Sequence, residues 1–213
     1  YTAVLDRTSS LILGLADMGI YDEFKPNEWR EDKLQLKHWD HWCVDTNLPV
    51  DTLHYLASKK AAQMLFAVVT SPAKAHRLRQ LLPTLDAVFA NRAEAGILIN
   101  SNTDVSQTIE EQARALCDLG ALRAIVTAGV DGAAWACPNS FGHITCRTIN
   151  SQSVSGAGDV LAGTTIAALV SGKTLEQALT YGTCAGTLST LSDRNDPQLS
   201  WSIIKDYLAH NDA

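Results

Sequence analysis

The amino-acid sequence predicts an α/β fold in which a mainly parallel sheet is flanked by helices. Four short apolar runs between residues 42 and 127 alternate with helix-like segments. This alternation is typical of the βαβ units that build parallel sheets. The chain of 213 residues is 46% apolar and 19% charged, which is the composition of a globular protein with a sizeable core.

The first twenty residues predict a β-hairpin. The β-prone runs 2–5 and 11–15 flank a polar, turn-like segment at residues 6–10. We therefore expect two parts in the chain, a small β element at residues 1–20 and an α/β core at residues 21–213.

The α/β core begins with alternating strands and helices. The four predicted strands cover residues 42–46, 65–70, 87–90 and 122–127. The predicted helices between them cover residues 51–62, 72–82, 93–99 and 104–120. Typical helix-start signals support the helices, namely Asp51 as an N-cap, Ser71 before Pro72, and a capping box of Asp104 and Gln107.

The last third of the sequence is mostly helical. Residues 156–170 have helical length, and Thr174 with Gln177 forms a capping box for a helix that ends near residue 191. Ser200 is the expected N-cap of a last helix, which ends near residue 208.

Composition argues against several classes of protein. The chain has 17 basic and 23 acidic residues, and its net charge of −6 argues against a general nucleic-acid binder. Its longest apolar stretch, residues 160–170, is too short to span a bilayer, and no signal peptide is visible. The five cysteines have irregular spacing, so we predict no disulfide framework and a cytoplasmic location.

Two motifs have plain structural explanations. Residues 167–174 nearly spell a phosphate-binding P-loop, but Gly172 ends one predicted helix and Thr174 begins the next, whereas a P-loop follows a strand. His38, His41 and Cys43 lie close in sequence, but no second ligand cluster follows at a closing spacing, so we predict no direct protein–metal site.

The segment Ser155-Gly156-Ala157-Gly158-Asp159 is the most distinctive motif. Small residues let a ligand approach the backbone, and free N–H groups in a first helical turn bind phosphate or a developing oxyanion. Asp159 would accept a proton from a hydroxyl held at the same helix end. The alternative is a tight loop before a helix that an acidic residue stabilises, and local physics leaves both explanations open.

Two further polar motifs follow predicted strands, where ligands bind in open α/β sheets. Asn91 can reach a phosphate oxygen and Glu94 can hold a water on Mg²⁺, whereas the alternative is an N-cap Asn with Glu in the first turn. Thr127, Gly129 and Gly132 suit a tight turn close to phosphate, and the alternative is an ordinary turn between strands.

These three motifs occur in the order in which ribokinase-like (phosphofructokinase B) carbohydrate and nucleoside kinases carry their N-x-x-E, T-x-G-x-x-G-like and G-A-G-D motifs. The chain resembles this family over essentially its whole length. The resemblance implies a ribokinase-like three-layer fold with a small β lid at the N-terminus, and it extends to the pseudouridine kinases. The stretches that support the subfamily are residues 1–6, 16–21, 44–49, Ser71 with Lys74, and 195–200.

The resemblance implies a role for the residues of each motif. Asp159 corresponds to the catalytic base, and the anion hole for the transferring phosphoryl group corresponds to Gly156, Ala157 and Gly158. The ATP- and Mg²⁺-binding residues correspond to Asn91, Glu94, Thr127, Gly129 and Gly132. The same resemblance places the adenine pocket at Thr183, Cys184 and Thr187, and the vicinity of the substrate or its phosphate at Asn47 and Lys74.

The sequence departs from the family pattern at several places, among them the following two. Many members carry Asp-Thr before the G-A-G-D motif and bind a monovalent cation there, whereas this chain has Ser153 and Val154. The family's N-terminal segment with its substrate-reading Gly-Gly…Asn motif has no counterpart here, and the chain begins at Tyr1 rather than Met. We therefore expect a trimmed piece of a longer protein, in which the hairpin is the rest of the lid.

The sequence thus predicts a kinase that uses ATP and Mg²⁺ to phosphorylate a hydroxymethyl group, first of all the 5′-hydroxyl of pseudouridine. Another sugar or nucleoside acceptor remains open, as does a nucleotide- or sugar-binding relative without turnover. Because a lid hairpin exposes strand edges, we also predict a homodimer through residues 1–15, with no nucleic-acid or membrane partner.

Overall fold

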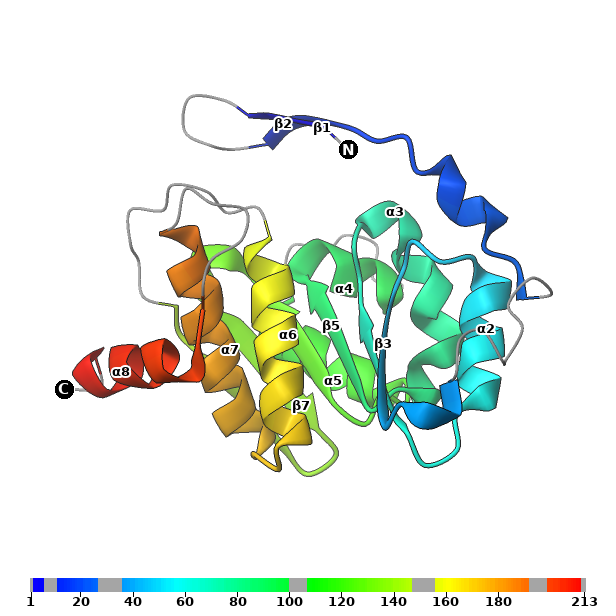
Figure 1. Ribbon diagram of the computed structural model, residues 1–213. Coiled ribbons are helices and arrows are strands. Elements are labelled where there is room, and N and C mark those ends of the chain that lie inside the picture. The colour runs from blue at the N-terminus through cyan, green and yellow to red at the C-terminus, as the bar shows by residue number, and fades with distance from the viewer. Residues whose placement is uncertain are drawn as a thin grey trace.

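The structure is a computed structural model that describes residues 2–5, 11–26, 36–99, 107–146, 156–191 and 199–211. Its core is a six-stranded sheet with the strand order β3-β4-β5-β6-β7-β8 and helices on both faces (Figure 1). Strands β3 to β6 run parallel, and β7 and β8 continue the sheet in antiparallel pairs. The predicted α/β fold with a mainly parallel sheet is confirmed.

The elements of this core are arranged in three layers. The strands are β3 (His41–Asp45), β4 (Met64–Val68), β5 (Ala87–Asn91), β6 (Ala124–Thr127), β7 (Ala133–Cys137) and β8 (Ser140–Ile144). One face carries α2 (Val50–Lys59), α3 (Pro72–Ala75), the 3₁₀ helix η4 (His76–Thr84), α4 (Arg92–Leu98) and α5 (Ile109–Asp118). The other face carries α6 (Ala157–Val170) and α7 (Leu175–Thr190), and α8 (Trp201–Asn211) packs against α7.

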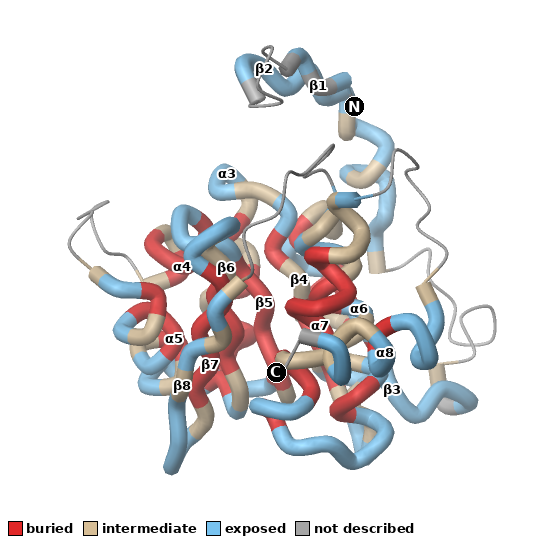
Figure 2. Tube along the Cα trace, turned by 90° about the vertical axis from the view of Figure 1, so that its left-hand side faces the viewer, coloured by how far each residue is buried: buried red, intermediate tan, exposed pale blue. Residues whose placement is uncertain are grey.

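The central strands contribute to two separate hydrophobic clusters. Leu65 and Ala67 of β4 belong to the cluster beneath α2, η4, α4 and α5, whereas Phe66 between them belongs to the cluster beneath α6 and α7. In β5, Val88 belongs to the first of these clusters and Phe89 to the second. The central strands are therefore buried on both faces (Figure 2), and such strands are continuous apolar runs. This double burial explains why the sequence predicts them.

The strands β7 and β8 form a hairpin that the sequence analysis does not predict. Three of the five residues of β7 are alanines, which are depleted in strands. The hairpin is stabilised by its surroundings instead, because β7 is buried between α5 and α7. A Cβ at Gly142 of β8 would lie 2.9 Å from the indole of Trp135, so this glycine makes room for the tryptophan.

Several predicted helix starts can be compared with the structure. Thr174 Oγ1 accepts from the backbone N–H of Gln177 at 3.2 Å, and Gln177 Oε1 accepts from the N–H of Thr174 at 3.3 Å, so this capping box is confirmed. Ser200 Oγ accepts a backbone hydrogen bond at the start of α8, also as predicted. The prediction for Asp51 is wrong, because α2 begins directly after Pro49 and Asp51 lies inside its first turn.

The start of α5 also differs from its prediction. The capping box is formed by Thr108 and Glu111, and the helix begins at Ile109. Gln107 precedes this box, and Asp104 lies outside the described residues. A Thr with Glu three residues later is an equally good local signal, so the choice is made by the burial of Ile109 and its neighbours against the sheet.

The predicted helix 72–82 is α-helical only in α3 and continues as the 3₁₀ helix η4. In a 3₁₀ helix, residues three apart lie on the same face. Leu78 and Leu81 have this spacing, and both are buried. The tighter helix therefore turns both leucines into the core.

The predicted N-terminal hairpin is confirmed. Strands β1 (Thr2–Leu5) and β2 (Leu11–Leu15) pair antiparallel, and the 3₁₀ helix η1 (Gly19–Glu23) follows them. Figure 1 shows the hairpin standing away from the core, on the side where α6 begins. Its apolar side chains Val4, Ile12, Leu13 and Leu15 are exposed.

Candidate functional site

Among the described residues, no side chain caps the N-terminus of α6. Gly156 occupies the N-cap position with φ of 80°, a left-handed conformation that favours glycine, and it has no side chain that could bond to the first turn. A Cβ at Gly156 or Gly158 would meet no described atom within 4 Å. The first-turn N–H groups and the helix dipole together favour an anion here.

A pocket lies where α6 begins above the carboxyl ends of three neighbouring strands. The residues that line it are Val68 at the end of β4 and Val69 after it, Phe89, Ala90, Asn91 and Glu94 from β5 and α4, Thr127 of β6, and Gly158, Asp159 and Leu161 of α6. The parallel register pairs Asn91 with Thr127, which brings two separate motifs side by side. Asp159, Gly158, Asn91, Glu94 and Thr127 thus meet in one pocket, which we call the donor pocket.

Asn91 and Glu94 cap the helix α4 and also line the donor pocket. Asn91 Oδ1 accepts from the Glu94 N–H at 3.0 Å and Glu94 Oε2 accepts from the Asn91 N–H at 2.8 Å, so the pair is the N-terminal capping box of α4. Glu94 is also buried, and burial raises the pKa of its carboxyl, with a smaller contribution from the carboxylate of Asp159 and an opposing one from Asn91. The structural role considered for these residues is therefore real, and it fixes them at the pocket.

The turn after β6 needs both of its glycines. Gly129 and Gly132 have φ of 58° and 90°. A Cβ at Gly132 would lie 2.1 Å from the carbonyl oxygen of Ile144, a distance no side chain can accept. The Ala128 N–H donates to the Gly132 carbonyl at 2.9 Å, which closes the turn over the 3₁₀ helix η5 (Gly129–Asp131). Thr127 lines the donor pocket, whereas neither glycine does.

A second pocket also borders Asp159, and we call it the acceptor pocket after the role proposed for it below. Its lining consists of Cys43, Val44, Asp45, Val68, Thr70, Asp159, Ala162, Gly163 and Ile166. Asp159 borders both pockets. Although Cys43 is exposed as a residue, desolvation of its sulfur, followed by the carboxylates of Asp45 and Asp159, raises the pKa of the Cys43 thiol to about 11. Cys43 therefore stays a neutral thiol at physiological pH.

The loop after β3 carries Asn47, which the structure brings to Lys74. Lys74 Nζ donates to Asn47 Oδ1 at 2.8 Å, and the Asn47 N–H donates to Asp45 Oδ1 at 2.7 Å. Arg77 Nη1 donates to the carbonyls of Thr46, Asn47 and Leu48, which fastens the whole loop. The predicted pair Asn47 and Lys74 therefore lies beside the acceptor pocket, through its link to Asp45.

Sequence reasoning missed Asp45 and Thr70 as lining residues. Both lie at the ends of predicted strands, β3 and β4, which are parallel neighbours in the sheet. The available signal was a polar residue at the end of each apolar run, the same signal that singled out Asn91 and Thr127.

The predicted adenine residues lie on α7 and line neither pocket. All three are buried. The Cys184 thiol lies 3.7 Å from the carbonyl of Ile204 and the Thr187 hydroxyl 3.3 Å from the Cys146 sulfur, while Thr183 Oγ1 has no hydrogen-bond partner among the described residues. The adenine assignment therefore stays a prediction.

Other predictions concern absences or residues outside the described ranges. Within the described ranges, no three His, Cys, Asp or Glu side chains come together as a metal site, and no helix is both long and apolar enough to cross a membrane. Ser153, Val154 and Ser155 lie outside the described residues.

Comparison with solved structures shows where this architecture occurs. A carbohydrate kinase from Agrobacterium tumefaciens is 29% identical, and the match covers 97% of this chain and 67% of that one with a TM-score of 0.80. Two structures with lower identity share the fold. A ribokinase from Thermotoga maritima has a TM-score of 0.70 at 24% identity over 84% of this chain and 59% of its own. A putative ribokinase II from E. coli, in complex with ATP and Mg²⁺, has a TM-score of 0.72 at 19% identity, and the match covers 89% of this chain and 64% of that one. The ribokinase-like fold is thereby confirmed.

Comparison of sequences gives the family. ATP-dependent 6-phosphofructokinase isozyme 2 of Escherichia coli is 25% identical over 80% of this chain and 56% of its own length. Ribokinase of Staphylococcus aureus is 28% identical over 57% of this chain and 40% of its own length. The chain thus spans about half the length of the curated relatives it matches. The sequence model described as pfkB family carbohydrate kinase matches residues 19–196. The chain belongs to the pfkB family of carbohydrate kinases.

Proposed function

We propose that this protein transfers the γ-phosphoryl group of ATP, with Mg²⁺, to the hydroxymethyl group of a sugar or nucleoside, and that its acceptor is the 5′-hydroxyl of pseudouridine. One observation carries the proposal. Asp159 borders two pockets at the start of α6, so a single carboxylate can face a phosphoryl donor on one side and a hydroxyl acceptor on the other. Phosphoryl transfer depends mainly on such positioning and on charge stabilisation.

The donor pocket has the groups that ATP and Mg²⁺ need. The uncapped first turn of α6, at Gly156, Ala157 and Gly158, offers N–H donors to the transferring phosphoryl group. The carboxylate of Glu94 would hold a water on Mg²⁺, the ion that neutralises phosphate charge when bound. Asn91 would reach a phosphate oxygen, and the turn with Thr127, Gly129 and Gly132 would run along the ATP phosphates.

The acceptor pocket suits a polar ring with a free hydroxymethyl group. Asp159 accepts the hydroxyl proton while the acceptor oxygen forms its bond to the γ-phosphorus, and the bond between that phosphorus and the ADP oxygen breaks. Asp45 and Thr70 line the same pocket, and Asn47 with Lys74 lies beside it. These groups offer both donors and acceptors to ring hydroxyls, and the choice of pseudouridine rests on the sequence resemblance.

Two further parts of the protein have proposed roles. Thr183, with its unpartnered buried hydroxyl, and the neighbouring Cys184 and Thr187 would lie along the adenine. The hairpin, with its exposed apolar side chains, would be a lid that pairs with the lid of a second copy through residues 1–15. Sedimentation at micromolar concentration tests the dimer, and a monomer with an intact hairpin would contradict it.

The function is tested by a transfer assay with ATP and Mg²⁺ on a panel of acceptors: pseudouridine, uridine, inosine, ribose and fructose. The assay compares the chain, any longer form from the same gene, and Asp159→Asn in each. Transfer to pseudouridine that Asp159→Asn abolishes is the expected result. Transfer to another acceptor would keep the mechanism and discard pseudouridine. ATP binding by both forms, with no transfer to any acceptor, would overturn the kinase proposal in favour of a binding protein.

A further inference from the structure

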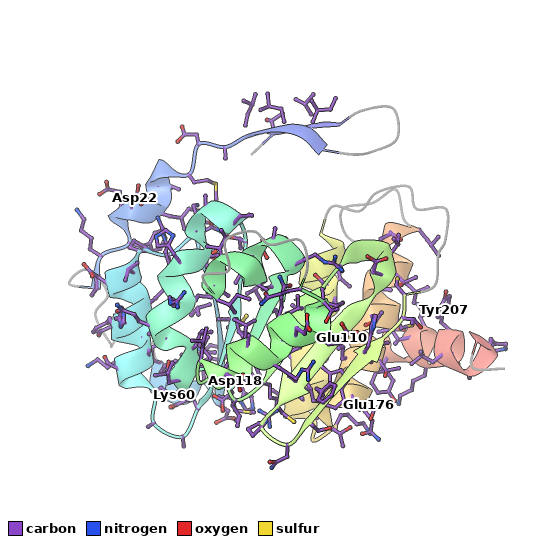
Figure 3. The ribbon with its side chains drawn as sticks, turned by 180° about the vertical axis from the view of Figure 1, so that it is seen from behind. Asp22, Lys60, Glu110, Asp118, Glu176 and Tyr207 are labelled. Atoms are coloured by element: carbon purple, nitrogen blue, oxygen red, sulfur yellow. The ribbon has the colours of Figure 1, made fainter. Side chains whose placement is uncertain are left out.

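His143 of β8 lies between two elements that the proposed mechanism does not connect. Its Nδ1 is 2.8 Å from Oε1 of Glu110, in the first turn of α5, and its Nε2 is 2.6 Å from the carbonyl oxygen of Asp131 in η5. Figure 3 labels Glu110 where α5 passes the strands at the edge of the sheet. The imidazole therefore bridges α5 and the turn that begins at Thr127.

Both partners of His143 can only accept hydrogen bonds. A carbonyl oxygen has no proton to give, and an ionised carboxylate has none either. The hydrogen bond from its own backbone N–H is the largest of the effects that lower the pKa of the Glu110 carboxyl, and the Thr108 hydroxyl and His143 lower it further, so Glu110 is ionised at neutral pH. Both contacts of the ring therefore lead to hydrogen-bond acceptors, one on α5 and one in the turn.

Asp131 also makes an exposed ion pair outside this bridge. Arg92 Nη2 lies 3.7 Å from Oδ2 of Asp131, and Arg92 directly follows Asn91 of the donor pocket. Arg114 makes a further contact between α5 and β8, with its guanidinium 4.4 Å from the ring centre of Phe141. The turn is thus linked to α5 through His143 and to the start of α4 through Arg92.

We propose that His143 is a positioning residue that fastens the turn at residues 127–132 to α5 and so tightens the binding of ATP. The inference rests on the proposed function, since the turn is expected to run along the ATP phosphates. The ring joins the two elements through its contacts to Glu110 and to the Asp131 carbonyl, so loss of the imidazole frees the turn from α5.

Steady-state kinetics test this inference through the KM for ATP. His143→Ala is expected to have a KM for ATP roughly three- to tenfold above the wild type, the factor for losing one hydrogen bond, while kcat and the acceptor KM stay close to the wild-type values.

Two variants serve as matched controls. His143→Gln keeps an N–H donor for the Asp131 carbonyl, so it should restore most of the affinity for ATP. Arg114→Ala cuts another contact between α5 and β8 without touching the turn, so its KM for ATP should match the wild type. A KM for ATP in His143→Ala that equals the wild-type value, or one that rises equally in Arg114→Ala, would overturn the proposal.

Amide hydrogen exchange of Gly132 and Asp131 gives a readout without ATP or turnover. Both amides bond within the turn, to the carbonyls of Gly129 and Ala128. Their exchange is expected to speed up about three- to tenfold in His143→Ala relative to Arg114→Ala. Unchanged exchange would refute the fastening itself. If no form of the protein uses ATP, the kinase proposal fails, but this measurement still decides whether His143 holds the turn.

Discussion

Substitution of Gly182 by Ala should destabilise the protein, although alanine is a better helix former. Gly182 lies inside α7, where it meets α6. A Cβ at this position would lie 2.0 Å from the hydroxyl oxygen of Thr165 and 2.7 Å from the carbonyl oxygen of Leu161. Neither contact is tolerable, so the Thr165 side chain must rotate and the two helices must move apart.

The magnitude follows from three effects. Helix propensity favours alanine by about 1 kcal/mol. Rotating Thr165 breaks its 2.7 Å hydrogen bond to Leu161 and leaves a buried hydroxyl without a partner, which costs about 1–3 kcal/mol. Separating two packed helices costs about another 1–3 kcal/mol. The net loss is roughly 3 kcal/mol, which lowers the melting temperature by about 6–12 °C in a chain of this size.

Urea and thermal unfolding measure this loss, and the chain offers a matched control. Gly163 lies in α6 with no atom within 4 Å of its missing Cβ, so Gly163→Ala should stabilise the protein by up to about 1 kcal/mol. The double change of Gly182→Ala with Thr165→Ala removes the worst contact and should recover part of the loss. If Gly182→Ala raises stability as Gly163→Ala does, the close packing of α6 on α7 is wrong.

The remaining predictions concern the two pockets. Burial raises the pKa of Glu94, so ionisation of its carboxyl opposes folding. The free energy of unfolding of Glu94→Gln should therefore increase relative to the wild type as the pH rises from about 4 to 8. A difference in free energy that stays constant with pH in urea unfolding would contradict this. With a pKa of about 11, Cys43 should react with iodoacetamide about tenfold faster per pH unit between about pH 7 and 10, and a plateau near pH 8 by mass spectrometry would contradict it. Lys74→Met removes the bond to Asn47 and should raise the acceptor KM severalfold, with KM for ATP unchanged in the same assay.

The sequence predicts best what depends on local signals. The capping box at Thr174 and the apolar runs of β4 and β5 depend on residues a few positions apart, and both are found in the structure. The hairpin of β7 and β8 depends on packing against α5 and α7, which lie far away in sequence, so its alanines gave no signal. At Asp104 the local signal was present, but a second capping box four residues later fits the packed helix.

The same contrast applies to the site. Asn91, Glu94 and Gly158 stand in recognisable motifs, whereas Asp45 and Thr70 become neighbours only because β3 and β4 pair in parallel and end together. Strand pairing is long-range information, and a single sequence does not display it.

Under the proposed function, the position of Asp159 would let the two pockets act as one site. A catalytic base must reach the acceptor hydroxyl, and the γ-phosphoryl group must lie close to the same oxygen. A carboxylate in the first turn of α6 that borders both pockets would meet both needs, since N–H groups of the same turn can bind the phosphoryl group. Glu94 is a buried carboxyl in one of these pockets, and the carboxylate of Asp159 adds to the larger effect of burial in raising its pKa. A bound Mg²⁺ would relieve that repulsion, so Mg²⁺ should bind more weakly to Asp159→Asn than to the wild type even without ATP.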